Sequence, residues 1–585
     1  MIGVHSAKFT AERVSENIRE AVLRHDIQHP VVNDVDFEIW QGYAVRAWPT
    51  VVLIDPRGRI IKTESGEIDA QDYIPQIERL ISEFETLGEL NREPLELRPE
   101  VVIEPRRPLR FPSKLLVTPD GRCYISDTAH HRIIELQLEG KGKPEAAVLR
   151  VFGNGQPALR DGLESEACFH YPRGMAINKD VLYVADTDNH AIRAIDLLDG
   201  KVRTIAGTGV KGGARFSPGP PTQIELRSPW AVYVVEDHTN GRETYLLIAM
   251  AGSHQIWLLR GEDRLGIFAG NGREALVDGP LAEASFNQPS DLAMGLGHLF
   301  VADAEASAIR AIFPGQNPRV FTLVGLGLFE FGDIDGVGEE ARLQHPTGIA
   351  YSDVEPVSHP PGEEGESKTG VIYIADSYNH KIKALDPTTG KIETLVGSGQ
   401  AGHKDGDFEE AELSQPEGLG IYQNQIYIAD TNNHLIRVAD LATKRVSTLQ
   451  LINLDRLEQE RPRPTRRLPP VALGEGQASI TLDLQLPEGL ALNLYAPIIV
   501  RQINPDSPHF EAQSGVHTFP SHGPVTIDLE ILESQELVMD LTLYYCEAYD
   551  QRLCMIHDAR LVLPVNVTPE APGSARVPYF VETLG

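Results

Sequence analysis

Tyr183–Arg193 reads YVADTDNHAIR, and Tyr427–Arg437 repeats it almost unchanged as YIADTNNHLIR. A pattern of this length that returns along a chain indicates a repeat architecture, in which every copy is one structural unit. Four further segments align with these two without gaps, and successive copies begin 53 to 73 residues apart. The four segments begin at Tyr124, Leu247, Phe300 and Tyr373.

Each copy predicts a strand, a turn and a second strand. The Tyr-Val-Ala-Asp step alternates larger apolar and small residues, as in a strand packed between sheets. The Asp-Thr-x-Asn-His step that follows is rich in side chains that bond nearby backbone and therefore favours a turn. A further strand precedes the copy, as in RGMAI (173–177), and another follows it, as in VRTIAGTG (202–209). Four short strands per unit make one blade of a β-propeller, so six units predict six blades.

These segments resemble NHL repeats, a family named after the Asn-His-Leu step that is present here as Asn433-His434-Leu435. The resemblance implies a six-bladed NHL β-propeller over residues 113–454. It also implies that a protein partner binds on one propeller face, because NHL propellers are mostly binding platforms. Some related propellers are enzymes, so a metal-dependent lyase or hydrolase with its ion in the central channel is a weaker alternative.

An Asp and a His recur at fixed places in the copies, and both residue types are common metal ligands. A metal ion needs ligands that converge on one point, whereas residues repeated in successive blades lie in a ring. We therefore interpret the repeated residues as structural and predict no metal site. The set comprises Asp127, Asp186, Asp303, Asp376 and Asp430 with His131, His190, His380 and His434, and Met250 interrupts the Asp series.

Residues 1–87 predict an α/β module in the order strand, helix, two hairpin strands and helix. Its stretch RAWPTVVLID (46–55) leads through Trp48, Pro49 and Thr50 into an apolar strand. This order resembles the later part of a thioredoxin-like domain. The resemblance implies that a cis peptide bond precedes Pro49 and that Trp48, Pro49 and Thr50 form a loop facing the substrate.

A thioredoxin-like domain begins with a strand and a Cys-x-x-Cys, and this sequence contains no Cys-x-x-Cys. We therefore expect that the module is not redox-competent in this chain. Two explanations stay open. The native start lies upstream, which we favour, or a half-domain docks elsewhere. In the first case the full-length protein would be a thiol-disulfide oxidoreductase.

Residues 471–585 alternate apolar and polar residues as the strands of a β-sandwich do, for example in ASITLDLQLP (478–487). Cys546 and Cys554 flank a short loop between two strands that we expect to pair, so a disulfide between them is geometrically conceivable. The stretch resembles the periplasmic N-terminal domain of a D-type thiol-disulfide interchange protein, which makes these two cysteines weak redox candidates. In a reducing cytosol, two thiols are the expected state. Cys123 and Cys168 lie in the repeats and are interpreted as buried, inert thiols.

Two stretches rich in Pro and Arg, 88–112 and 455–470, are predicted to be linkers. They divide the chain into a partial thioredoxin-like domain (1–87), the propeller (113–454) and a C-terminal β-sandwich (471–585). The predicted fold class is therefore mainly β. In this combination the whole chain resembles the family of NHL repeat-containing protein 2, with the N-terminal part of the thioredoxin-like domain absent.

The formal net charge of −31 makes nucleic acid a poor partner, because binding to phosphate is driven by Lys and Arg. No apolar run is long enough to span a membrane, and no signal peptide is visible, so we expect a cytoplasmic protein without a membrane partner. No motif indicates a cofactor. The sequence leaves open the identity of the partner, the propeller face that binds it and the oligomeric state.

Overall fold

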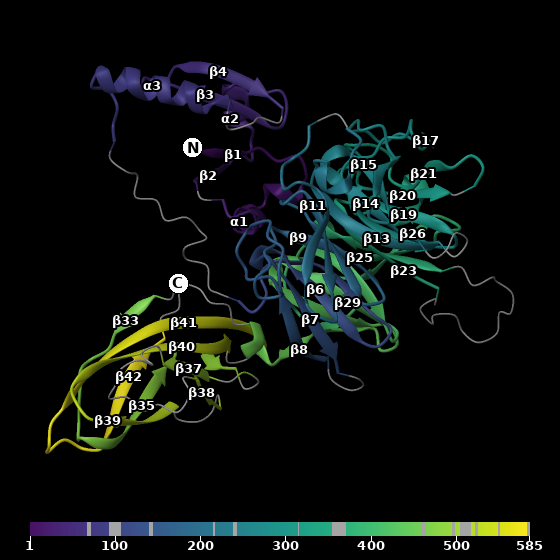
Figure 1. Cartoon of the computed structure of the whole chain (residues 1–585). Helices are drawn as coiled ribbons and strands as arrows, with labels where there is room; N and C mark the ends of the chain where they lie inside the picture. The colour runs from purple at the N-terminus through teal and green to yellow at the C-terminus, as the bar shows by residue number, and fades with distance from the viewer. Residues whose placement is uncertain are drawn as a thin grey trace. The chain divides into compact units, whose positions relative to one another are not determined.

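The computed structural model describes two compact units, Met1–Glu104 and Pro105–Gly585 (Figure 1). The described residues are 1–581 except 28, 67–71, 93–106, 140–143, 214–216, 238–242, 314, 354–369, 458–463, 494–495, 497, 503–515, 521–524 and 548–549.

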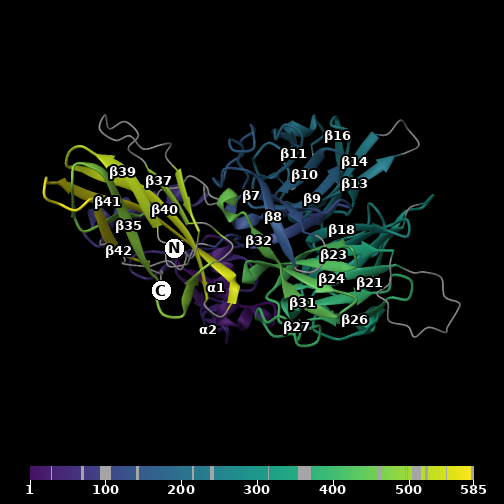
Figure 2. The same ribbon diagram turned by 90° about the horizontal axis from the view of Figure 1, so that it is seen from below.

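Six sheets of the second unit each contain four consecutive antiparallel strands, and we number these sheets blades one to six (Figures 1 and 2). The first strand of each blade contacts the first strand of the next, and the circle closes from blade six back to blade one. A sheet repeated around an axis in this way hides its edges from solvent. The fold is therefore mainly β and built on a propeller, as the repeats predict.

The strands run from the axis outward in each blade. Blade one contains β5 (Pro112–Val117), β6 (Arg122–Asp127), β7 (Arg132–Leu138) and β8 (Glu145–Phe152), and blade two contains β9 (Pro172–Asn178), β10 (Val181–Asp186), β11 (Ala191–Asp196) and β12 (Val202–Ala206). Blade three contains β13 (Pro229–Asp237), β14 (Glu243–Met250), β15 (Gln255–Arg260) and β16 (Arg264–Ala269), and blade four contains β18 (Pro289–Gly295), β19 (His298–Asp303), β20 (Ala308–Phe313) and β21 (Arg319–Val324). Blade five contains β23 (Pro346–Ser352), β24 (Val371–Asp376), β25 (Lys381–Leu385) and β26 (Lys391–Val396), and blade six contains β28 (Pro416–Tyr422), β29 (Gln425–Asp430), β30 (Leu435–Asp440) and β31 (Arg445–Thr448).

Short strands complete the outer rim of several blades. The two-residue strands β17 (Gly279–Pro280), β22 (Gly336–Val337) and β27 (Gly406–Asp407) pair with the outer strands of blades four, five and six. The strand β32 (Gln450–Ile452) pairs in parallel with β8 at the rim of blade one. Blade one therefore contains residues from both ends of the propeller sequence.

The inner strands approach one another closely because several of them carry glycine near their start. A Cβ atom added to Gly348 of β23 would lie 1.7 Å from the backbone oxygen of Glu417 in β28. One added to Gly418 would lie 2.6 Å from the Cα atom of Lys114 in β5. Any larger side chain at these positions would push neighbouring blades apart.

The first unit contains two separate pairs of strands. β1 (Gly3–His5) pairs in parallel with β2 (Val31–Asn33), and β3 (Thr50–Ile54) pairs with β4 (Ile60–Ser65) as a hairpin. Within the described residues these two pairs are not hydrogen-bonded to each other. The helices are α1 (Ser15–Arg24), α2 (Glu38–Gly42) and α3 (Ile74–Thr86), with a 3₁₀ turn η1 at Ala11–Arg13. The predicted order of strand, helix, hairpin and helix is present, and β2 and α2 were not predicted.

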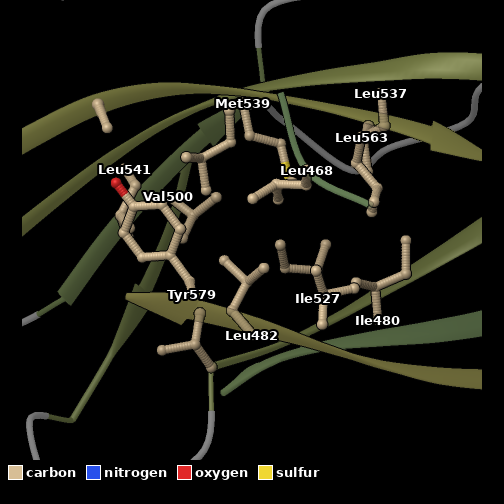
Figure 3. Close-up of a cluster of buried hydrophobic side chains, with 14 of the residues drawn as sticks. Leu468, Ile480, Leu482, Val500, Ile527, Leu537, Met539, Leu541, Leu563 and Tyr579 are labelled. Atoms are coloured by element: carbon tan, nitrogen blue, oxygen red, sulfur yellow. The ribbon is translucent and has the colours of Figure 1, made fainter. Parts of the chain in front are cut away.

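The C-terminal region forms two sheets. The larger contains β33 (Thr465–Arg467), β34 (Val471–Leu473), β36 (Leu490–Leu492), β37 (Ile498–Gln502), β38 (Val516–Phe519), β40 (Gln535–Glu547) and β41 (Asp550–Val567), and the smaller contains β35 (Gly476–Gln485), β39 (Val525–Ile531) and β42 (Ser574–Phe580). Alternate residues of both sheets meet in one apolar core. Figure 3 shows this core, where Leu482 and Ile527 of the smaller sheet face Met539, Leu541 and Leu563 of the larger one.

The described residues between the last blade and this sandwich include a packed segment. It contains the 3₁₀ segment η10 (Leu454–Leu457), whose two leucines are buried with residues of blade one. The buried hydroxyl of Tyr544 in β40 donates a 2.7 Å hydrogen bond to the backbone oxygen of Leu454. The predicted linker 455–470 thus includes residues that pack, and the predicted domain boundaries remain predictions.

Candidate functional site

The repeated Asp of a blade is the centre of a buried hydrogen-bond network, which is clearest in blade two. The carboxylate of Asp186 is fully buried and accepts hydrogen bonds from the backbone N–H of His170 at 2.7 Å, from Asn189 at 2.8 Å and from Arg193 at 2.8 Å. The guanidinium of Arg193 continues to Asp161 in the preceding blade-to-blade connection at 2.8 Å. Burial raises the pKa of Asp186, and Arg193 opposes this rise. The network therefore fixes the turn and the connection to each other.

The same network recurs around the ring. Arg310 joins Asp303 to Asp278 in blade four, and Arg437 joins Asp430 to Asp405 in blade six. Each of these Arg residues lies seven positions after its Asp. Sequence reasoning missed the Arg, although its recurrence at a fixed offset was a usable signal. Two blades use a different cation. In blade one, Arg132, five positions after the repeated Asp127, pairs with it. In blade five, where the repeated Asp is Asp376, Lys383 takes the place of the Arg and pairs with Asp333 and Asp335 of the connection.

The repeated His joins each blade to the next one. In five blades its Nδ1 accepts a hydrogen bond from a backbone N–H just before the inner strand of the following blade. Burial lowers the pKa of His380 to about 4, which keeps this acceptor nitrogen unprotonated at neutral pH. The pairs are His131 with Tyr171 at 3.3 Å, His190 with Ser228 at 3.1 Å, His254 with Gln288 at 3.2 Å, His380 with Gln415 at 3.1 Å and His434 with Phe111 at 3.0 Å. Sequence reasoning missed His254, although it aligns with the other four.

The repeated Asp and His side chains therefore lie in a ring and bind partners within the fold. Among the described residues, no group of three or more His, Cys, Asp or Glu side chains is arranged to hold a metal ion.

Blades three and four depart from the pattern in ways that replace the lost contacts. In blade three, buried Met250 and Trp257 occupy the positions of the Asp and the Arg, so both charges are replaced together. The Met250 sulfur still accepts the backbone N–H of Arg227 at 3.4 Å. In blade four, Ser307 replaces the His, and its hydroxyl accepts the backbone N–H of His345 at 3.2 Å.

Two ion pairs cross the central axis of the propeller. Lys114 of blade one lies 2.7 Å from Asp291 of blade four, directly across the ring. Arg173 of blade two lies 3.0 Å from Glu417 of blade six, and its guanidinium also lies over the ring of Trp230 at 4.4 Å. All four charged side chains are mostly buried. The axial carboxylates Asp291 and Glu417 are thus already paired with protein cations.

One edge of the propeller carries its longest loops. Because strands alternate in direction, the turn after the second strand and the connection after the fourth leave a blade at the same edge. We call this edge the connection face and the opposite edge the hairpin face. Asn side chains of the turns hold the connections by their backbone oxygens, as in the hydrogen bonds of Asn189 to Ala158 at 2.8 Å and of Asn433 to Gly402 at 2.6 Å. The loops of this face are therefore held in place by hydrogen bonds to the blades.

The predicted loop of the first unit is also well anchored. The Trp48–Pro49 peptide bond is cis, as expected. The Trp48 indole donates a 2.8 Å hydrogen bond to the backbone oxygen of Ser6, and its ring lies 4.5 Å from that of Trp40. The Thr50 hydroxyl donates to the backbone oxygen of Ala47 at 2.7 Å. No cysteine precedes Cys123 in the sequence, so the first unit contains no thiol.

The cysteines fall into two groups. The Cα atoms of Cys546 and Cys554 are direct cross-strand partners in β40 and β41, as the sequence predicted, and Cys546 is fully buried. The side chain of Cys554 lies outside the described residues. Cys123 and Cys168 are buried in the propeller, and burial raises the pKa of Cys123 to about 12. Both propeller thiols lack the solvent access that a reactive cysteine needs.

Comparisons with known proteins agree with this architecture. The model of the NHL repeat family matches residues 169–195. The chain is 35% identical to NHL repeat-containing protein 2 of Bos taurus, over 97% of this chain and 82% of that protein, and 34% identical to the Homo sapiens protein over 98% and 83%. It is also 34% identical to Protein SUPPRESSOR OF QUENCHING 1, chloroplastic, of Arabidopsis thaliana, over 99% of this chain but 56% of that protein.

Among solved structures, one chain of a nidogen–laminin complex matches 55% of this chain and 91% of its own length, with a TM-score of 0.35 and 14% identity. Across the described residues, no helix is long and apolar enough to cross a membrane.

Proposed function

Because the chain belongs to the family of NHL repeat-containing protein 2, we propose that it is a scaffold that binds a protein partner on the connection face of its propeller. The observation that carries this proposal is the set of buried networks that hold the blade-to-blade connections to the blades. Binding residues are often found on loops that a rigid scaffold positions.

Cross-linking tests which face binds. The full chain, mixed with a cell extract and a short lysine-reactive cross-linker, is expected to capture partners through Lys211 and Lys404, which lie in connections. Lys179 and Lys444 are the matched controls, because they lie in the tight turns of the hairpin face between paired strands. Partners cross-linked mainly to these control residues would contradict the proposal.

Thiol-disulfide exchange in the sandwich is a second candidate function, favoured by the cross-strand register of Cys546 and Cys554. The thiolate of one cysteine would attack a partner disulfide and form a mixed disulfide. The second thiolate would then release the partner as two thiols and leave a Cys546–Cys554 disulfide. Two electrons pass to the partner disulfide, and the two thiol protons end on its sulfurs.

Alkylation and mass spectrometry of the full chain in glutathione buffers test this second candidate. We expect the two cysteines to become oxidised together as one linked pair. Cys123 and Cys168, whose cross-strand partners are not cysteines, should stay reduced as internal controls. Retention of both Cys546 and Cys554 thiols in oxidised glutathione would contradict it.

An insulin-reduction assay of the full chain tests our hypothesis about the redox competence of the first unit. We propose that this module is not redox-competent, because it contains no cysteine, and that the anchored Trp48–Thr50 loop is a remnant of a substrate-facing edge. Insulin reduction that survives substitution of all four cysteines would overturn this view. The proposed location of the protein is the cytoplasm.

A further inference from the structure

Four of the five blade-to-blade connections begin in the same way. After a glycine at the end of the outer strand comes a polar residue whose side chain accepts the backbone N–H two positions on. This local hydrogen bond stabilises the first turn of the connection. The four bonds join Asn154 to Gln156 at 2.9 Å, Thr208 to Val210 at 3.2 Å, Asn271 to Arg273 at 2.8 Å and Ser398 to Gln400 at 3.2 Å.

The connection between blades four and five, residues 325–345, breaks this pattern. Leu326 occupies the position of the polar residue, and a leucine side chain cannot accept the hydrogen bond. Leu326 is 46% exposed, and Phe329 is 68% exposed, more than any other described aromatic side chain. This connection therefore lacks the local side-chain hydrogen bond of the other four and exposes two large apolar side chains to solvent.

The later part of this connection shows that the difference is local. Ile334 and Val337 are also about half exposed, but the equivalent positions in other connections, Val277 and Leu163, are apolar and equally exposed. Apolar residues at those two positions are therefore an ordinary feature of this propeller. Leu326 and Phe329 distinguish the connection, and exposed apolar residues of this kind mark interaction sites when they gather on a surface.

The segment that carries Leu326 and Phe329 is fixed at both ends. A Cβ atom added to Gly325 would lie 2.7 Å from the Cβ atom of Ala308, so the chain is packed tightly against blade four there. At the other end Asn379 donates a 2.7 Å hydrogen bond to the backbone oxygen of Gly332, and the N–H of Gly332 donates to Leu343 at 2.9 Å. The apolar side chains are presented by a pre-ordered loop, which lowers the entropy cost of binding.

The connection that carries these side chains has a negative formal charge. Residues 326–345 contain five acidic residues and one Arg. Asp333 and Asp335 are paired with Lys381 and Lys383, whereas Glu339 and Glu340 are exposed beyond them. A partner that carries positive charge would be attracted to this surface, and an acidic one would be repelled.

We propose that Leu326 and Phe329 dock a segment of a partner protein in which one or two large apolar residues are flanked by Lys or Arg. The apolar residues would cover the two exposed side chains, and the basic residues would face the acidic side chains of the connection. The proposal rests on the proposed scaffold function and names the sector of the connection face and the chemistry of the partner.

A random dodecapeptide display library selected on the full chain tests the proposal. The test variant is Leu326→Asn with Phe329→Gln, which restores the polar character of the sibling connections. The control is Leu198→Ser, which removes an apolar side chain that is 78% exposed in a turn of the hairpin face. Selected peptides are expected to combine apolar anchors with Lys or Arg, and their Kd should rise at least about tenfold in the test variant but stay unchanged in the control.

The outcomes separate this proposal from the scaffold function. Basic peptides that bind the test variant as tightly as the natural chain, or enriched peptides that are acidic, would overturn the docking site and leave the scaffold function standing. Failure of the library and of the cross-linking experiment together would contradict both. If sedimentation shows instead that the natural chain dimerises and the test variant is monomeric, a second copy covers Phe329 and the peptide proposal is wrong.

Discussion

The Nδ1 atom of His434 accepts the backbone N–H of Phe111 at 3.0 Å, and these residues are 323 positions apart in the sequence. His434 follows the second strand of blade six, and Phe111 immediately precedes the first strand of blade one. Four other blades make the same bond to their successors, but there a continuous connection also joins the blades. At this seam the side chain of Thr431, which donates a 2.9 Å hydrogen bond to the backbone oxygen of Pro112, adds a second bond.

Replacing His434 with alanine is expected to lower the free energy of unfolding by about 1–3 kcal/mol, because the buried Phe111 N–H loses its acceptor. The matched variant is His190→Ala, which removes the same bond between blades two and three. Its N–H donor, that of Ser228, is only partly buried, so water can replace the histidine and the loss should be smaller. Urea unfolding followed by fluorescence measures both. Equal losses would show that the seam is no more sensitive than the other junctions.

Blade three, which has Met250 and Trp257 in place of the Asp and its cation, allows one charge to be introduced without the other. Met250→Asp would place a carboxylate beside the apolar Trp257, where four of the other blades have Arg or Lys. We expect a loss of about 3 kcal/mol or more in the free energy of unfolding, because an unpaired buried charge is strongly destabilising. The double variant Met250→Asp with Trp257→Arg should recover part of this loss. A single variant that is as stable as the natural chain would show that water reaches this position.

The stability of blade five should depend on pH through Asp376. Burial raises the pKa of Asp376 to about 7, against an ordinary value of 3.8, with Lys383 opposing the rise. The folded state therefore holds this proton more tightly than the unfolded state. The contribution is fully present below about pH 4 and is lost as the pH rises through 7. Relative to the non-ionisable variant Asp376→Asn, the natural chain should lose at least about 1 kcal/mol between pH 4.5 and pH 8.

Asp127 provides a control of opposite sign. The cations His130 and Arg132 overcome the effect of burial there and lower the pKa of Asp127 to about 2. Its contribution should be constant above about pH 5 and should fall as the pH decreases toward 2. Urea midpoints of Asp127→Asn and Asp376→Asn across this range would test both signs. A flat difference between the natural chain and Asp376→Asn from pH 4.5 to pH 8 would contradict the raised pKa.

The repeats made the propeller predictable because each copy carries its own strand and turn pattern. The positions of the repeated Asp and His followed directly, but their partners did not. Arg193 lies on the next strand, and Asp161 lies in the connection before the blade, so their meeting depends on how strands stack. The Asp-Gly steps of the connections were visible in the sequence, yet nothing local indicates that their carboxylates reach back to an Arg.

The axial contacts could not be predicted from the repeats at all. Lys114 and Asp291 occupy a position where three other blades have glycine, and they are 177 residues apart. They meet because a ring of six places the first and fourth blades opposite each other. Likewise, the pairing of β32 with β8 needed the closed ring, since that strand follows the last repeat without a signature of its own.

The axial pair itself gives the last prediction. Lys114→Met would leave Asp291 without its cation in a mostly buried position, so we expect a loss of about 3 kcal/mol or more in the free energy of unfolding. Adding Asp291→Leu should restore much of that loss, because an apolar pair of similar size can replace a buried ion pair. Urea unfolding of both single variants and the double variant gives the coupling energy between the two residues. Additive losses would show that the two side chains do not interact and would contradict the axial ion pair.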